Sequence, residues 1–360
     1  MSMSFTTDEL GAPSGSDFVA SLRGAAPYLH AFRGRTFVVV FPGEGVADGS
    51  FASLAHDIAF LSGLGIRLVL VHGARPQIAE QMQRRGVAPR FAGDWRITDA
   101  AALEAVKEAA GRMRLEIEAG LASGLARSPQ IGGGLRVVGG DFVRARPVGV
   151  REGVDFQYTG EVRSVAGGRI RRCLDAGEMV LLSPLGYSAT GELFNVAAEE
   201  VAAGVAAALP ADKLLFLMEG ADPKTGAAGL PGQLTLAQAR SAADEGTQSP
   251  EVDRHLRTAV AACDAGVPRV HLVGREREGA LLQELFTRDG VGTLVAADRY
   301  EDTRTATPDD IPGILALIAP LEEEGVLVRR GRERLESEGD RFWVMERDGA
   351  GIATAALYPF

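Results

Sequence analysis

The chain has 360 residues, of which 46% are hydrophobic and 6% aromatic, and its formal net charge is −10. This length suits two α/β domains, or one large and one partial domain, and the negative charge argues against nucleic acid or an anionic membrane as a partner. The two cysteines, Cys173 and Cys263, stand far apart and outside any Cys/His cluster, so we expect reduced thiols in a cytoplasmic protein without a metal site.

The chain begins with a polar tail and an amphipathic helix. Residues 1–17 lack the basic and apolar regions of a signal peptide, and we interpret them as a disordered tail. Residues 18–34 carry an apolar stripe at helical spacing, which predicts a helix capped by Asp17. The stripe consists of Phe18, Leu22, Ala25 and Leu29. No later stretch is apolar and long enough to span a bilayer.

The chain is organised around residues 35–77, where two apolar runs each end in a glycine turn. Phe37–Phe41 leads into Pro42-Gly43-Glu44-Gly45, and Leu68–Val71 leads into His72-Gly73-Ala74-Arg75-Pro76. Apolar spacing between the runs predicts a helix over Phe51–Gly63. Unbroken β-branched runs are typical of strands buried on both faces of a parallel sheet. A right-handed crossover would then place both turns at one carboxyl edge, where glycines let N–H groups approach an anion.

These motifs resemble the amino-acid-kinase fold and, within it, the N-acetylglutamate kinase and synthase group. The resemblance implies an α/β fold, a three-layer sandwich with a largely parallel central sheet. Kinases of the group carry a lysine where this chain has Val40, with glycines such as Gly43 after it, and a glycine-rich turn where it has His72, Gly73 and Arg75. Phosphoryl transfer depends on positioning and charge neutralisation, so the missing lysine argues against kinase chemistry. The pattern GEG with HGARPQI resembles bacterial N-acetylglutamate synthase, in which a kinase-like domain regulates an acetyltransferase domain.

Strands and helices alternate through the middle of the chain. We expect a loop or hairpin over Val87–Trp95, and then a long helix over Thr98–Ser123, capped by Thr98 or Asp99. Alternation broken by glycines predicts paired strands within Arg136–Gly149 and Gln157–Val165. A short helix over Ile170–Ala176 and a buried strand over Met179–Ser183 follow.

A second part of the kinase pattern is also altered. We predict a helix over Phe194–Leu209, whose start resembles the kinase run Asn-x-Asn-Ala-Asp but has Glu199 in place of the aspartate. A buried strand is predicted over Lys213–Met218, a short helix over Thr235–Ala243, and a helix over Val252–Ala265, where kinases begin with a second phosphate-binding lysine. Here the nearest base is Arg257, so both kinase lysines are missing.

A third motif resembles the arginine-inhibition signature of the group. His271 and Leu272, in a strand predicted over Arg269–Val273, precede a helix predicted over Gly274–Asp289 that contains the start of ELFTRDGVGT. Glu284 could bind a guanidinium bidentately, while Gly290 and Gly292 would leave the backbone open to the α-amino and α-carboxyl groups. The resemblance further implies Lys213 at the α-carboxylate and Tyr28 covering the ligand. The alternative is a surface glutamate with a structural His271.

The last segment, residues 304–360, resembles the start of a GNAT acetyltransferase domain. After a strand, Thr307 or Asp309 would cap a helix, and Phe342–Met345 and Gly351–Leu357 form a predicted antiparallel pair. The family's acetyl-CoA loop, Arg/Gln-x-x-Gly-x-Gly/Ala, does not occur after Arg304, so we name no catalytic residue and expect little activity from this chain alone. Candidate glutamate-binding residues are Arg329, Arg330 and Tyr358.

These observations predict the tail (1–17), an oligomerisation helix (18–34), an arginine-binding regulatory domain (35–298), a linker (299–303) and part of a GNAT domain (304–360). The function that the resemblance implies is acetyl transfer from acetyl-CoA, a co-substrate rather than a bound cofactor, to L-glutamate, with L-arginine as effector. The resemblance also implies a cytoplasmic homo-oligomer, a hexamer. The alternatives are an arginine-sensitive N-acetylglutamate kinase and a non-catalytic arginine sensor.

Overall fold

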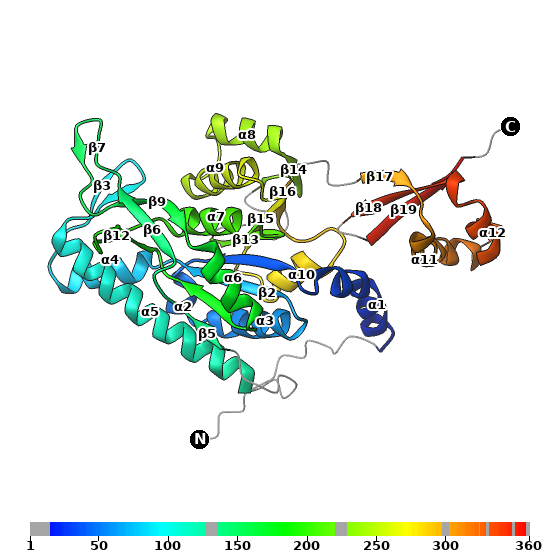
Figure 1. Cartoon of the computed structure of the whole chain (residues 1–360), viewed down its shortest axis with the longest axis horizontal. Helices are drawn as coiled ribbons and strands as arrows, with labels where there is room; N and C mark the ends of the chain where they lie inside the picture. Colours follow the sequence, from blue (N-terminus) through cyan, green and yellow to red (C-terminus); the bar gives the residue numbers. More distant parts are fainter. Residues whose placement is uncertain are drawn as a thin grey trace, which may run out of the picture. The chain divides into compact units, whose positions relative to one another are not determined.

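The computed structural model of the chain describes residues 15–126, 136–219, 229–296, 302–323, 325–328, 331–347 and 350–357. The chain divides into two compact units. One spans Phe32–Asp302, and the other combines Met1–Ala31 with Thr303–Phe360. Figure 1 labels their helices and strands.

The larger unit is built on an eight-stranded sheet in the order β14-β16-β15-β13-β1-β2-β10-β5. Its neighbouring strands are parallel except for β15 and β16. The strands are β1 (Thr36–Phe41), β2 (Arg67–His72), β5 (Val137–Val138), β10 (Met179–Leu182), β13 (Lys213–Met218), β14 (Gln233–Thr235), β15 (Arg269–Gly274) and β16 (Thr293–Ala296). The largely parallel sheet, with β1 beside β2, is confirmed.

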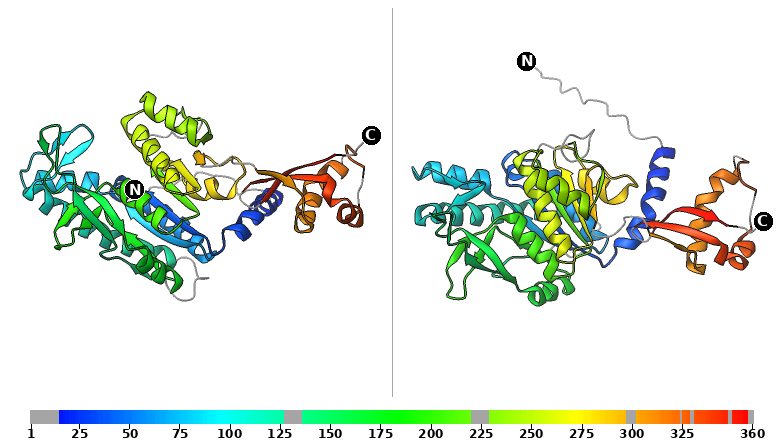
Figure 2. Two further views of the ribbon diagram at one scale, coloured as in Figure 1. Left: turned by 45° about the horizontal axis from the view of Figure 1, so that its top comes forward. Right: turned by 90° about the horizontal axis from the view of Figure 1, so that it is seen from above.

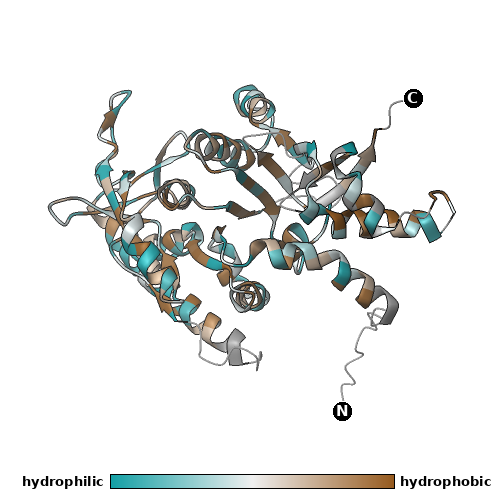
Figure 3. Cartoon of the chain, turned by 45° about the vertical axis from the view of Figure 1, so that its right-hand side comes forward, coloured by the Kyte–Doolittle hydropathy of each residue, from teal (hydrophilic) through white to brown (hydrophobic). Residues whose placement is uncertain are grey.

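Helices cover both faces of this sheet. In Figure 1, α3 and α5 lie below the central strands and α7 and α9 lie above them, and Figure 3 shows these strands as mostly hydrophobic. The helices are α2 (Glu44–Ala47), α3 (Phe51–Gly63), α4 (Arg75–Arg84), α5 (Ala100–Ala126), α6 (Gly167–Asp175), α7 (Ala198–Ala208), α8 (Leu236–Glu245), α9 (Pro250–Asp264) and α10 (Ala280–Phe286). The three-layer arrangement is therefore as predicted, and α3 has the predicted bounds.

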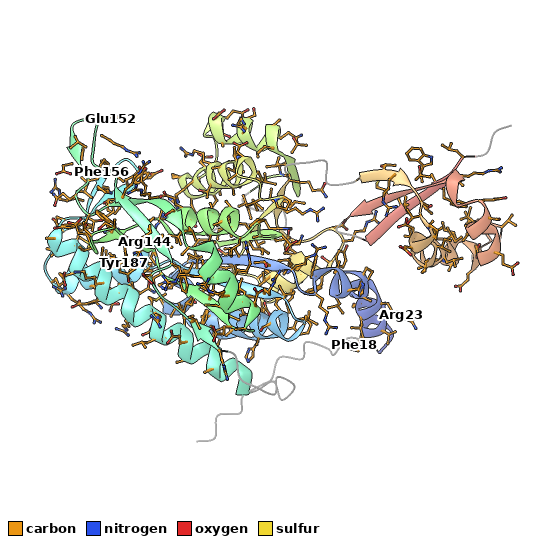
Figure 4. The ribbon with its side chains drawn as sticks, viewed as in Figure 1. Phe18, Arg23, Arg144, Glu152, Phe156 and Tyr187 are labelled. Atoms are coloured by element: carbon orange, nitrogen blue, oxygen red, sulfur yellow. The ribbon has the colours of Figure 1, made fainter. Side chains whose placement is uncertain are left out.

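A second sheet in the same unit has the order β12-β11-β6-β9. Its β6 and β9 form the predicted antiparallel pair, and Arg144 and Tyr187 take paired positions on β6 and β11 (Figure 4). Two further hairpins belong to this part of the sequence: β3–β4 precedes β6, and β7–β8 connects β6 to β9. The strands are β3 (Arg90–Ala92), β4 (Trp95–Ile97), β6 (Val143–Pro147), β7 (Val150–Arg151), β8 (Val154–Asp155), β9 (Gly160–Val165), β11 (Leu185–Tyr187) and β12 (Leu193–Asn195).

The smaller unit contains helix α1 (Gly15–Phe32, whose last residue is grouped with the larger unit) and a three-stranded sheet, β17-β18-β19 (Figure 2). Thr307 precedes η2 as its N-cap, and its N–H and hydroxyl both donate to Asp310 Oδ2 at 2.7 Å. The other elements are β17 (Asp302–Thr305), η2 (Pro308–Asp310), α11 (Ile311–Glu323), α12 (Arg332–Ser337), η3 (Gly339–Arg341), β18 (Phe342–Arg347) and β19 (Ala350–Ala356). The predicted antiparallel pair is confirmed.

Helix α1 differs from its prediction. It begins at Gly15, so Asp17 lies inside the helix and is not its cap. Phe18 and Leu22 of the predicted buried stripe are exposed, whereas Tyr28 and Phe32 are buried. Figure 4 labels Phe18 on this exposed half of the helix. Phe18 and Leu22 are therefore not covered by the part of the chain that the structure describes.

Two other helices are shorter than predicted. The helix predicted over Phe194–Leu209 begins at Ala198, because Phe194 and its neighbours pair with β11 as strand β12. The helix predicted over Gly274–Asp289 spans only Ala280–Phe286, because Gly274 still belongs to β15 and Gly279 has a φ of +69°. A left-handed residue does not continue a right-handed helix.

Candidate functional site

Three ionisable side chains form a buried chain of hydrogen bonds. Lys213 begins β13, His271 lies in β15 and Glu284 lies on α10. Lys213 Nζ is 3.3 Å from His271 Nε2, and His271 Nδ1 is 2.6 Å from Glu284 Oε1. All three residues are buried. The structure thus brings together three residues that the sequence assigned to one site.

The turn after α10 completes the surroundings of Glu284. Its Oε2 atom accepts hydrogen bonds from the N–H groups of Val291 and Gly292, each at 2.8 Å. A Cβ on Gly292 would lie 2.3 Å from the Leu272 carbonyl oxygen, and one on Gly290 would lie 2.5 Å from Glu284 Oε2. Both glycines are therefore needed for this close approach. The sequence suggested that the Gly292 N–H would be open to a ligand. It is not, because it already donates to Glu284.

Burial sets the protonation of this cluster. It lowers the pKa of Lys213 to about 7, and the charge of Arg269 lowers this pKa further. The charges of Glu284 and Asp212 partly oppose these effects. Burial also lowers the pKa of His271. Burial alone would raise the pKa of Glu284, but the hydrogen bond from His271 and the amide donors bring it below its usual value. A neutral His271 therefore donates from Nδ1 to an ionised Glu284 and accepts from Lys213 at Nε2.

The last residue of α1 covers Lys213. The centroid of the Phe32 ring lies 5.1 Å from Lys213 Nζ, and Phe32 packs against Phe37 and Phe286. Sequence reasoning did not single out Phe32, although it stands one helical turn after Tyr28. Tyr28 is 7% exposed on the same face of α1, and its role as an effector ligand stays a prediction.

The two glycine turns after β1 and β2 meet at the carboxyl edge, as predicted. A Cβ on Gly73 would lie 3.2 Å from the Gly43 nitrogen, and Gln77 Nε2 donates to the Gly43 carbonyl at 2.6 Å. Val40, at the position of the kinase lysine, is buried beside Val71 and Phe216. An apolar side chain thus stands where a kinase would present a charge to a phosphate.

His72 has a structural place at this edge. Its Nδ1 is 2.9 Å from the Gly73 carbonyl oxygen and its Nε2 is 2.9 Å from Ser183 Oγ. Burial lowers the pKa of His72 to about 4, although the hydrogen bond to Gly73 raises it somewhat. The ring is therefore neutral, donating to the carbonyl and accepting from Ser183, so it ties β2 to the segment that follows β10.

Glu199 holds two arginines at the former kinase site. Its Oε1 atom accepts from Arg75 at 3.3 Å and from Arg254 at 3.1 Å. Burial alone would raise the pKa of Glu199, but the charges of Arg75, His255 and Arg254 bring it below its usual value. Arg257, predicted as the nearest base, instead donates to a carbonyl within its own helix. The basic residue of this helix that reaches Glu199 is Arg254, one turn before Arg257.

The predicted glutamate-binding residues Arg329, Arg330 and Tyr358 lie outside the described residues. Within the described ranges, no group of three or more His, Cys, Asp or Glu residues is arranged to hold a metal ion. No described helix combines the length and apolar character needed to cross a membrane.

Comparison with known proteins agrees with the fold. Residues 35–274 match the amino acid kinase family. An amino-acid acetyltransferase from Azotobacter vinelandii is 51% identical over 348 residues, which cover 95% of this chain and 79% of that protein.

Two solved structures of N-acetylglutamate synthase from Neisseria gonorrhoeae also match 95% of this chain. The one complexed with coenzyme A and L-arginine has 38% identity and a TM-score of 0.82, and the match covers 79% of it. The one complexed with coenzyme A and N-acetyl-glutamate has 39% identity and a TM-score of 0.71, and the match covers 78% of it. With such relatives along nearly its whole length and an amino acid kinase fold, the chain belongs to the amino-acid acetyltransferase family of acyltransferase enzymes.

Proposed function

We propose that this protein is an N-acetylglutamate synthase that is regulated by L-arginine and serves the first step of arginine biosynthesis. The α-amino nitrogen of L-glutamate, as the free amine, attacks the thioester carbon of acetyl-CoA. The new C–N bond replaces the C–S bond, and the nitrogen loses a proton as the thiol of coenzyme A leaves. The observation that carries this proposal is the close relationship to amino-acid acetyltransferases.

The Lys213–His271–Glu284 cluster is the proposed arginine site. A carboxylate offers about four acceptor positions, and three of those of Glu284 are occupied by His271, Val291 and Gly292. Guanidinium is the cation best suited to a buried carboxylate, so we assign it the remaining position. The α-carboxylate of arginine would then reprotonate Lys213. The arginine complex of the Neisseria gonorrhoeae enzyme supports this choice of effector.

In this proposal the kinase-like unit acts as a sensor and not as a kinase. Val40 supplies no charge, and the Arg75 and Arg254 guanidiniums are both already paired with the Glu199 carboxylate. A nucleotide would have to compete with the nearly buried Glu199 carboxylate to bring its phosphates to either arginine. The kinase hypothesis therefore has the family fold in its favour but not the charged side chains, while a sensor module would show the same arginine binding as a complete synthase.

Residues 304–360 of the smaller unit are proposed to belong to the acetyltransferase domain. Its helices α11 and α12 and sheet β17-β18-β19 follow the order expected for the start of a GNAT fold. The assignments of Arg329, Arg330 and Tyr358 to glutamate stay predictions, as does the low activity of this chain. An assay for coenzyme A release from acetyl-CoA, dependent on L-glutamate, tests the chemistry directly.

A thermal-shift titration with L-arginine, run beside ATP-Mg, tests the sensor. We expect arginine alone to raise the melting temperature, since a ligand at ~100 times its Kd stabilises a fold by about 2.7 kcal/mol. Glu284→Gln should abolish the shift, because the amide keeps the shape and loses the charge. Glu116→Gln, which breaks an exposed ion pair with Arg112 on α5, is the matched control and should respond like the wild type. A shift with ATP and none with arginine would replace this proposal with the kinase hypothesis.

A further inference from the structure

A pocket of about 400 Å³ lies at the carboxyl edge of the central sheet, between α3 and α10. Phe41 and Leu217, at the ends of β1 and β13, line it from the sheet. The strand order reverses between these two strands: β2 and β10 lie beyond β1, and β15 lies beyond β13. Open α/β sheets bind ligands at such a reversal, and ligand pockets commonly measure about 300–1,000 Å³.

This pocket borders the glycine turn after β1, since Pro42 and Gly45 line it, but it does not overlap the Lys213 cluster or the Glu199 network. It is lined by the start of α3 and by residues 275–281, which lead into α10, and by none of the residues of the Lys213 cluster or the Glu199 network. Phe60 and Phe286, at the opposite ends of the same two helices, pack against each other with ring centroids 6.1 Å apart. The amino-terminal ends of α3 and α10 therefore border a space for which neither the arginine site nor the former kinase site accounts.

Most of the lining is apolar. The rings of Phe41 and Phe51 lie 5.3 Å apart at a tilt of 31°, and aliphatic side chains also line the pocket. The aliphatic lining residues include Leu54, Leu217 and Leu281. Such walls bind an apolar group by removing its surface from water.

One charged group in the pocket has no partner. Asp57 lines the pocket, and among the described residues its carboxylate makes no hydrogen bond or ion pair. Burial raises the pKa of Asp57 to about 6, and the charge of Glu278 adds to this effect. Glu278 itself accepts a hydrogen bond from Ser53 Oγ at 3.4 Å. A half-buried carboxylate without a counter-ion is unfavourable, so this corner favours a cation.

The arginines of the pocket do not neutralise Asp57. Arg275 is bound to Glu219, to Asp48 at 2.8 Å and to Ser50 Oγ at 3.0 Å. Arg277 is exposed, and Glu276 beside it carries the opposite charge. Arg275 is therefore paired with other groups and Arg277 faces water, so the part of the pocket around Asp57 stays negative.

We propose that this pocket binds a small organic cation, a primary ammonium on a compact apolar body, with the ammonium at Asp57. The three N–H donors of an ammonium suit the acceptors that are close together there, which are Asp57, Glu278 and the Ser53 hydroxyl. The apolar body lies against Phe41, Phe51 and the leucines. An anion would be repelled by both carboxylates, and a neutral ligand would leave Asp57 unpaired.

The probe for this proposal is benzylamine, with benzyl alcohol and benzoate as neutral and anionic comparators of the same shape. Titration calorimetry of the full chain at pH 7.5 should show benzylamine binding at least ten times more tightly than either comparator. Its affinity should fall as the pH drops below 6 and Asp57 takes up a proton. Absence of benzylamine binding, or equal binding of benzyl alcohol, would overturn the proposal.

Two variants locate the bound probe. Asp57→Asn keeps the shape and should weaken benzylamine binding at least tenfold. Ala52→Trp, at an exposed position that also lines the pocket, should block the space and weaken binding equally. The control, Asp175→Asn, removes a carboxylate that pairs with Arg67 on the surface and should bind like the wild type. Unchanged binding in both pocket variants, or displacement of benzylamine by an L-arginine concentration that saturates its own thermal shift, would move the probe elsewhere and refute the assignment.

Discussion

Lys213 is buried against the ring nitrogen of His271, with the Phe32 ring on its other side. Its pKa falls from 10.5 to about 7 because of this burial. Between these two values the unfolded chain binds a proton that the folded chain releases. The free energy of unfolding therefore rises with pH across this window, and below pH 7 the lysine must be buried as the ammonium.

Replacing Lys213 by methionine tests this titration. From pH 7 to pH 9 the wild type should gain about 2 kcal/mol of unfolding free energy from Lys213, and Lys213→Met should lose this gain because it has no proton to release. Urea unfolding at the two pH values gives the difference directly. Equal pH dependence in both proteins would mean that Lys213 keeps its usual pKa in the folded state.

Position 292 requires a glycine because a larger residue would clash with its neighbours, not because of its backbone angles. A Cβ there would lie 2.3 Å from the Leu272 carbonyl, so Gly292→Ala must displace the turn that donates to Glu284. We expect Gly292→Ala to lower the unfolding free energy by about 1–3 kcal/mol. The variant should also lose the thermal shift that arginine induces.

Gly111 supplies the matched control, because it lies within α5 and a Cβ there would meet nothing within 4 Å. Gly111→Ala should stabilise the protein by about 0.5–1 kcal/mol, since alanine loses less backbone entropy in a helix. Denaturant unfolding of both variants distinguishes a steric requirement from a general cost of alanine. If Gly292→Ala were as stable as Gly111→Ala, the turn would not be held as described.

At the scale of elements, Glu199 joins α7 to α4 and α9 through Arg75 and Arg254. The carboxylate is nearly buried, whereas Arg75 reaches solvent. Because the pKa of Glu199 is lowered, its contribution to stability is present above the usual pKa of 4.5 and is lost as the pH falls through the folded value. The network thus fixes three helices around a site that no longer needs to bind phosphate.

Glu199→Gln should therefore destabilise the protein at pH 7 by about 1–3 kcal/mol, less than for a fully buried pair because Arg75 can turn to water. The difference from the wild type should shrink toward pH 4. Chemical denaturation at both pH values measures it, with Glu245→Gln on the exposed face of α8 as control. ATP-Mg should produce no thermal shift in either variant, and a shift in Glu199→Gln would show that the network alone excludes the nucleotide.

The elements that the sequence predicted best are those with one dominant signal. The run FVVVF gave β1, and the apolar spacing after it gave α3 with its observed bounds. The signal was ambiguous near Phe194, where an alanine-rich helix follows directly and only pairing with β11 makes the residue a strand. It was also ambiguous after Gly274, because charged residues fit a helix as well as the loop that precedes α10. Long-range pairing, which single-sequence patterns do not contain, decided the first case, and pairing of Gly274 together with the left-handed Gly279 decided the second.

In the candidate site, too, some residues could be predicted from the sequence and others depend on the three-dimensional structure. The resemblance identified His271, Glu284 and the two glycines, and the structure brings them together. It did not identify Phe32 or Arg254, because covering a lysine or reaching a carboxylate from another helix depends on side-chain direction. Helical spacing would have favoured Arg254 over Arg257 only if the position of Glu199 in space were known.

At the scale of the whole molecule, the first half of α1 is an apolar surface without an assigned partner. Phe18 and Leu22 are 59% and 52% exposed. Isolated exposed apolar residues are common, but a row of them on one helix marks an interaction surface. We propose that this row joins copies of the chain, consistent with the hexamer that the family resemblance implies.

The double variant Phe18→Glu/Leu22→Glu tests this surface. Four new carboxylates or more would meet wherever two such helices pack, so the assembly should dissociate into smaller oligomers of unchanged fold. Val150→Glu adds one such charge at another exposed apolar residue, on β7, and should leave the oligomer intact. Analytical ultracentrifugation gives the mass of each, and circular dichroism checks the fold. A hexamer that survives the double substitution would place the contacts between copies on another surface, and the exposed half of α1 would then need a different partner.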